Sequence, residues 1–369
     1  MTLALLVLLT LCAMAVPMLP AFLEWRRPSD VQPLPIDETD ALDPPFLARS
    51  FAARLAAAVQ AGQTELGRTE IVAGPPAGQP LALTEAERTA GATHRLWHAA
   101  GDLRLPDGMA FYAEVAAKGA LRAGERSVCK ALWAGGALRL GQQSSVLRWA
   151  HGDEVFVGQA CELAGRVTAE RLLVLAPGVG FTLLHAPRLQ FLPYVAPGAA
   201  VPATTDGAAL TGVQWDASGR RAIGQGPLAV PAGTAWQGDL ICHGDLTLAP
   251  RCAVRGSLKV RGRLTVGAGC VIRGGVFAED AIVLDEACSV QGVLMSERSI
   301  ALGAGCTVGT LAVPANVAAP QIDIGAGVVV HGTVWAGEQG RCVAPLPAAV
   351  PAGAGAWPSQ PGSPPAGAQ

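Results

Sequence analysis

The sequence predicts an all-β fold, a parallel β-helix (β-solenoid) of about 18 residues per coil, with an N-terminal transmembrane helix. The clearest signal is an apolar-x-apolar triplet that recurs every six residues from Leu228 to Val308, with turn residues such as "RGS" and "GAG" between triplets. Each triplet has the alternation of a very short strand, and three triplets close one coil. An α-helix cannot produce this pattern, because six is not close to a multiple of 3.6 residues.

The composition favours the same fold. Charged residues make up 15% of the 369 residues and aromatic residues 5%, while Gly occurs 45 times and Pro 28 times. Such a chain is rich in turns and has a core of small side chains. The formal net charge is −2. Because a nucleic-acid-binding domain shows a basic excess, we expect no nucleic-acid partner.

Residues 1–25 are predicted to form a transmembrane anchor. The segment from Leu3 to Leu23 holds no charged residue, and as a helix it would measure about 31 Å, the thickness of a bilayer's hydrocarbon core. Trp25 falls at the expected membrane interface, and Arg26 and Arg27 follow it. By the positive-inside rule, these arginines keep the rest of the chain in the cytoplasm. The expected topology is therefore a single membrane crossing with the bulk of the chain in the cytoplasm.

Two features complicate the anchor. Pro17 and Pro20 each remove a helix hydrogen bond and would kink or shorten the helix. The sequence from Ala13 to Ala15 also resembles a signal-peptidase site, although no basic residue precedes the apolar run as a signal peptide requires. An anchor is favoured over a cleaved signal peptide.

Short segments separate the anchor from the repeats. Residues 26–44 are rich in Pro and Asp and predict a linker, and residues 45–62 predict an amphipathic helix. The apolar stripe of this helix consists of Leu47, Phe51, Leu55 and Val59. We expect the stripe to pack on the domain that follows. Residues 63–100 show no clear period and predict a linker or irregular structure.

Two repeat arrays are expected. The second, residues 228–337, carries the regular triplets. The first, residues 101–191, is less regular, and its apolar positions recur about once per coil, at Leu103, Leu121, Leu138, Val155 and Leu173. Residues 192–227 predict a loop between the arrays, and residues 338–369 a disordered tail rich in Pro, Gly and Ala. The matching coil lengths favour stacking of the two arrays, and two separate solenoids are the alternative.

Four cysteines of the second array recur once per coil, and the repeat places them in one inward column: Cys252, Cys270, Cys288 and Cys306. Successive coils lie about 4.8 Å apart, which spreads four sulfur atoms over about 14 Å. A tetrahedral metal site needs ligands that converge on one ion at about 2.3 Å. The column is therefore interpreted as core packing, with no metal.

The sequence offers no catalytic machinery. It lacks a GxSxG turn, a phosphate-binding loop and an HExxH helix, and its six histidines have no metal-ligand spacing. We expect no enzyme activity and no cofactor. An enzyme alternative is the left-handed β-helix acyltransferase, which is built from hexapeptide repeats with the same coil length. It needs a loop histidine, for which His243 or His331 would be the candidates.

The segment "QGDLICHGDLTLAPRCAVRGSLKVRGRLTVGAGCVIRGGVFAEDAIVLDEACSVQGVLMSERSIALGAGCTV" resembles a bactofilin domain. Bactofilins are polymer-forming bacterial cytoskeletal proteins. The likeness covers residues 228–308 well and residues 101–191 weakly. It implies a right-handed β-helix, assembly into filaments without nucleotide, and a scaffolding role at the cytoplasmic face of the inner membrane.

An open solenoid end presents unpaired strand edges and an apolar core, so it needs a cap or another copy of the chain. Joined ends that do not close produce a filament. The expected polymer-end coils lie around Leu103, Leu105 and Phe111 at one end, and around Val330, Val334 and Trp335 at the other. Predicted partners are further copies of the chain, the membrane and an unidentified protein cargo. A chain capped at both ends would instead be a non-polymerising, membrane-tethered adaptor.

Overall fold

The computed structural model describes residues 4–5, 9–10, 14, 16–26, 43–76, 79–193, 205–206, 210 and 212–343. The chain forms two compact units, residues 1–44 and 45–369. The first unit contains a 3-10 turn, η1 (Val16–Met18), and a helix, α2 (Leu19–Arg26). Most of the predicted linker, most of the predicted tail and Arg27 lie outside the described residues.

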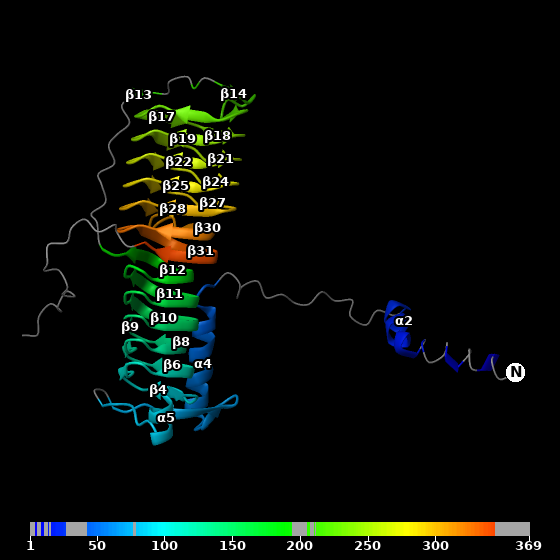
Figure 1. Cartoon of the computed structure of the whole chain (residues 1–369), viewed down its shortest axis with the longest axis vertical. Coiled ribbons are helices and arrows are strands. Elements are labelled where there is room, and N and C mark those ends of the chain that lie inside the picture. Colours follow the sequence, from blue (N-terminus) through cyan, green and yellow to red (C-terminus); the bar gives the residue numbers. More distant parts are fainter. Residues whose placement is uncertain are drawn as a thin grey trace, which may run out of the picture. The chain divides into compact units, whose positions relative to one another are not determined.

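The second unit is the predicted solenoid, with about 13 turns of roughly 18 residues each (Figure 1). Its first array contains twelve strands: β1 (Glu65–Leu66), β2 (Thr69–Ala73), β3 (Ala92–Thr93), β4 (Leu96–Ala99), β5 (Leu103–Arg104), β6 (Ala110–Ala117), β7 (Leu121–Arg122), β8 (Val128–Ala134), β9 (Leu138–Leu140), β10 (Ser145–Val157), β11 (Glu162–Leu175) and β12 (Gly180–Phe191). Beyond the β1–β2 hairpin, strands of successive coils pair in parallel.

The second array consists mostly of the short strands that the triplets predict. They are β13 (Thr205–Asp206), β14 (Val213–Trp215), β15 (Arg221–Gly224), β16 (Leu228–Val230), β17 (Thr234–Gln237), β18 (Asp239–Cys242), β19 (Leu246–Leu248), β20 (Ala253–Arg255), β21 (Leu258–Val260), β22 (Leu264–Val266), β23 (Val271–Ile272), β24 (Val276–Ala278), β25 (Ile282–Leu284), β26 (Ser289–Val290), β27 (Leu294–Ser296), β28 (Ser299–Leu302), β29 (Thr307–Val308), β30 (Ala315–Ile324) and β31 (Val329–Cys342). In a typical strand, the outer two residues of a triplet are buried and the middle one is not.

Glycine and aspartate at the corners hold neighbouring coils together. A Cβ atom on Gly256 would lie 2.1 Å from the carbonyl oxygen of Gly238. The two backbones can approach this closely only because Gly256 has no side chain. Beside this corner, the Asp239 carboxylate accepts a hydrogen bond of 2.8 Å from the backbone N–H of Ser257, one coil further on. Such contacts fix the length of the coil in this part of the chain.

Two helices accompany the first array. Helix α4 (Phe46–Gln60) lies along the side of the stack, with Ala48, Phe51, Leu55 and Ala58 buried (Figure 1). Leu47 and Val59, which the sequence placed on the same stripe, are exposed, because the contact follows alternating steps of three and four residues rather than four alone. Helix α5 (Glu85–Ala90) lies within residues 63–100. That stretch, predicted to be irregular, also contains β1 to β4 and belongs to the solenoid.

The two arrays form one continuous stack, which answers the question that the sequence left open. The last coil of the first array, β12, pairs with the last coil of the second, β31, and this pairing is antiparallel, unlike the coil-to-coil pairing elsewhere in the two arrays. The two arrays therefore meet by their C-terminal ends (Figure 1). The tail was predicted to begin at residue 338, but strand β31 continues to Cys342.

The predicted loop 192–227 has a length that suits this arrangement. The chain leaves β12 at the junction and next pairs as β13 with β17, at the far end of the second array. The two points are about seven strand spacings of ~4.8 Å apart, roughly 34 Å. The roughly 13 residues between β12 and β13 reach up to about 43 Å when extended. Residues 194–204, 207–209 and 211 lie outside the described residues, and β14 and β15 occupy the end of the predicted loop.

Candidate functional site

The cysteine column points into the solenoid core, as predicted. Each thiol is at most 1% exposed and donates a hydrogen bond to a backbone carbonyl 21 residues earlier in the chain. The four S···O distances lie between 3.0 and 3.3 Å, for Cys252 to Pro231, Cys270 to Ala249, Cys288 to Gly267 and Cys306 to Asp285. The position thus requires a small side chain with a hydrogen-bond donor at an inward corner.

In the first array, serine as well as cysteine occupies the equivalent inward corners. Ser127 donates to the carbonyl of Pro106 at 3.1 Å, Ser144 to Gly124 at 2.8 Å, and the Cys161 thiol to Gly141 at 3.0 Å. Serine therefore performs the same task as cysteine. Burial raises the pKa of Cys270 to about 12, so its thiol is neutral and a weak nucleophile at neutral pH. Among the described residues, no group of three or more His, Cys, Asp or Glu side chains could hold a metal ion.

The junction between the arrays is tightly packed. Leu184 faces Val334 and Leu189 faces Val330, and all four side chains are fully buried. Gly340 lies opposite Phe181, where an added Cβ would come within 2.1 Å of the Phe181 ring. Strand pairing and apolar contact therefore close both C-terminal ends.

Polar contacts also cross the junction. His185 Nδ1 lies 2.9 Å from Thr333 Oγ1, and the Nδ1 of His331 lies 2.9 Å from the carbonyl oxygen of Pro187. His331 thus contributes to the junction, whereas His243 follows β18 in the second array, several coils away. Of the two candidate histidines of the acyltransferase alternative, the structure therefore places one in the junction and the other on the second array.

The predicted polymer-end coils are wrong at one place and only partly right at the other. Val330 and Val334 lie inside the junction, and Trp335, although 57% exposed, faces Leu183 of β12 across it. The prediction failed there because it took the last regular coil of the second array for a free end. At the other place, Phe111 is not outermost, because it pairs with Thr93 of a further coil, whereas β5, which contains Leu103, pairs only with β7 among the described residues.

The true outer end of the first array is capped. Helix α5 begins with a capping box in which Thr84 and Glu87 bond each other's backbone N–H groups. The Glu87 carboxylate also accepts hydrogen bonds from Thr93 and Arg95, and the bond from Arg95 is the main reason that its pKa falls from 4.5 to about 2. Leu81, just before the helix, packs against the end of the core. Beside this cap, β5 and β3 still each have a single strand partner among the described residues, β7 and β6.

The outer end of the second array is less closed. Strand β16 pairs with β19, and no second partner is found among the described residues. Beside it, β14 and β15 form a hairpin that brings Trp215 onto Trp236, with ring centroids 5.1 Å apart and an interplanar angle of 11°. Trp215 is still 47% exposed. An aromatic surface and a strand edge therefore lie together at this end.

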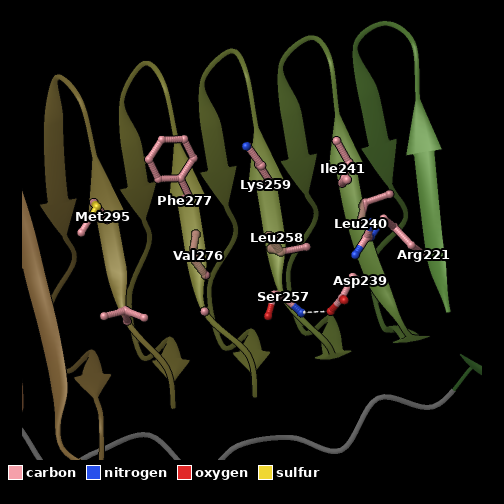
Figure 2. A pocket seen from close by; sticks show the side chains of 12 residues that line it. Arg221, Asp239, Leu240, Ile241, Ser257, Leu258, Lys259, Val276, Phe277 and Met295 are labelled. Carbon is pink, nitrogen blue, oxygen red and sulfur yellow. Dashed lines mark hydrogen bonds between the residues drawn. The ribbon is translucent and has the colours of Figure 1, made fainter.

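A groove of about 500 Å³ lies on one side face of the second array. Figure 2 shows that the side chains of four successive strands line it, at Ile241, Lys259, Phe277 and Met295. Val293 also lines the groove and is 46% exposed, and Met295 is 43% exposed. Sequence analysis missed this groove, because it assigned the middle residue of each triplet to solvent without comparing those residues between coils.

The membrane-interface residues lie in the first unit. Trp25 is 78% exposed at the C-terminal turn of α2, and Arg26 ends that helix; Arg27 lies outside the described residues. Along the described part of the chain, the structure contains no helix with both the length and the apolar character needed to cross a membrane.

Comparisons with known proteins add no identity. Neither the family models, nor the curated proteins, nor the solved structures include a match to this chain.

Proposed function

We propose that this protein is a membrane-anchored, polymer-forming scaffold of the bactofilin type, rather than an enzyme. The observation that carries the proposal is the antiparallel junction of β12 with β31. There, two solenoid ends of this chain join through strand pairing and buried apolar side chains. A solenoid end that can join another end in this way is the physical requirement for assembly without nucleotide.

Assembly would use the outer ends of the stack. The stronger candidate is the end with β16, Trp215 and Trp236, because it combines an unpaired edge with exposed aromatic surface. Contact between two copies through this end alone would close as a dimer, whereas a filament also requires the end with α5. In the proposed scaffold, α5 must therefore either move away from this end or bind a second copy of the chain.

The membrane anchor is proposed from the sequence of residues 1–25. Its described apolar side chains are exposed, as a membrane segment requires: Leu19 by 57%, Phe22 by 51% and Leu23 by 56%. If the anchor works as proposed, the protein stays in the membrane fraction after carbonate washing, and residues beyond Arg27 are digested by protease only from the cytoplasmic side. Release of the protein by carbonate would contradict the anchor.

A non-polymerising adaptor is the second candidate. The observation that favours it is the cap made by Thr84, Glu87 and Arg95 at the outer end of the first array. A capped stack would tether its cargo to the membrane without assembling.

Negative-stain electron microscopy of the full chain in detergent, without nucleotide and under reducing conditions, distinguishes the two functions. Filaments that shorten to single stacks in Trp215→Asp would support the polymer. The matched control is Leu147→Asp, which alters another exposed apolar residue, 43% exposed, on the first array. Single stacks at all protein concentrations would support the adaptor.

A further inference from the structure

One row of outward-facing residues runs along the same side of both arrays. The strand register connects each member to the next across neighbouring coils and across the junction. The row consists of Ile241, Lys259, Phe277, Met295, Ala318, Trp335, Leu183, Arg166, Trp149, Ala131 and Glu114. The two halves of this row can therefore be compared residue by residue.

In the first array, this row binds a helix. Helix α4 packs over Ala131 and Trp149, and the ring centroids of Phe51 and Trp149 lie 5.3 Å apart. At one end, Arg49 of the helix forms an ion pair of 2.9 Å with Glu170 of β11. Helix α4 contains arginines and no acidic residue, so a basic amphipathic helix lies on a face that carries a carboxylate.

The geometry explains why this face accepts a helix. Coils follow one another at about 4.8 Å, and one turn of an α-helix rises about 5.4 Å. A helix parallel to the stack therefore places one apolar side chain per turn over one strand per coil. The buried residues of α4 follow this rule at steps of three or four residues, at Ala48, Phe51, Leu55 and Ala58.

In the second array, the same row is open. Its members Ile241, Lys259, Phe277 and Met295 line the groove of about 500 Å³ (Figure 2). These four strands extend over about 14 Å, which corresponds to roughly ten helical residues. The groove thus has the length and the apolar floor of a helix-binding face.

The groove differs in charge from the site where Glu170 binds Arg49 of α4. Lys259 and Arg221 line it, and the one carboxylate, that of Asp239, already accepts the Ser257 backbone hydrogen bond. The Lys259 ammonium lies 5.6 Å from the centre of the Phe277 ring, beside the apolar floor. An occupant with carboxylates next to its apolar stripe matches this arrangement.

We propose that the groove of the second array binds an amphipathic helix of a partner protein, with acidic residues flanking the apolar stripe. The stripe would lie over Ile241, Phe277 and Met295, and the carboxylates would reach Lys259 and Arg221. This mode repeats the packing of α4 on the first array with the charges exchanged. It does not depend on polymerisation, because no outer end of the stack takes part.

The test uses the full chain in detergent and a fluorescent peptide with the sequence of residues 45–62, carrying R49E and R54E. This probe keeps the apolar stripe of α4 and reverses its charge. We expect saturable binding, at least tenfold tighter than that of the unaltered peptide. Phe277→Asp should weaken binding at least tenfold, and Lys259→Glu should shift the preference towards the unaltered, basic peptide.

The control variant is Val283→Asp on β25, a neighbouring strand outside the groove, where Val283 is 36% exposed. It should leave the affinity unchanged, and unchanged thermal unfolding of each variant verifies its fold. The proposal is overturned if the acidic peptide does not saturate, or if Phe277→Asp binds it as tightly as the wild type does. It is also overturned if Phe277→Asp abolishes binding to anionic lipid vesicles, or dissociates a dimer, because the groove would then serve a membrane or a second copy.

Discussion

The two arrays share a coil length, a core and a row of outward-facing residues, but they differ in what packs on that row and in the lengths of their strands. In the row of the first array, Ala131 and Trp149 are covered by α4, whereas in that of the second array Met295 is 43% exposed to solvent. The first array also has long strands that continue around corners, such as β10 with 13 residues, and the second mostly has three-residue strands separated by turns. We infer that the first array is the reinforced part of the stack and the second is the part available to partners.

The largest expected effect concerns the junction that joins the two halves. Leu184→Asp would place a charge in the fully buried contact with Val334. A buried, unpaired charge costs more than about 4 kcal/mol, and we expect the single unfolding transition to split into two, one for each array. Differential scanning calorimetry measures this directly. Leu147→Asp at an exposed position should keep a single transition, and an unchanged single transition in Leu184→Asp would show that the contact of Leu184 with Val334 does not couple the two arrays.

The next effect tests the reinforcement by α4. Phe51→Ala removes a ring that is 4% exposed and packs against Trp149. We expect the free energy of unfolding to fall by about 3–5 kcal/mol. Leu47→Ala, on the exposed side of the same helix, should change it by less than about 0.5 kcal/mol. Equal effects of the two substitutions in urea titrations would refute the packing role of α4.

A smaller effect tests whether serine and cysteine perform the same role at the inward corners of the two arrays. Cys270→Ala leaves the Ala249 carbonyl without its thiol donor and should cost about 1–3 kcal/mol. Cys270→Ser keeps a donor, as Ser127 and Ser144 do in the first array, and should cost less than the alanine variant. Thermal unfolding under reducing conditions ranks the two. A serine variant less stable than the alanine variant would contradict the hydrogen-bonding role.

The smallest effect is a pH dependence confined to the capped end of the first array. The pKa of Glu87 is about 2 in the folded chain and 4.5 in the reference state, mainly because Arg95 donates to its carboxylate. A lowered folded pKa stabilises the fold above pH 4.5, and this stabilisation is lost as the pH falls from 4.5 to about 2. The melting temperature of Glu87→Gln should therefore lie below that of the wild type at pH 7, and the two should converge near pH 2. A constant difference over that range would assign the stabilisation to another group.

Much of the second array was predictable because its period is local. The triplets around residues such as Leu258 and Leu264 specify both the strand and its buried face, and the spacing of the cysteines specifies the coil. The first coil of the first array was not predictable in this way. There, α5 interrupts the period one coil before β5, so that residues 63–100 were taken for irregular structure.

By itself, the sequence determined the solenoid, its coil length and the inward cysteine column, because each depends on a short spacing that repeats along the chain. The tertiary structure alone decided that the two arrays meet by their C-terminal ends. It also decided that α4 covers Ala131 and Trp149 of the outward row, whereas Phe277 and Met295 line an open groove. These features join segments that are far apart in the sequence, such as Phe51 and Trp149 or Leu184 and Val334. No local period records such contacts, since they depend on how the completed arrays fit against each other.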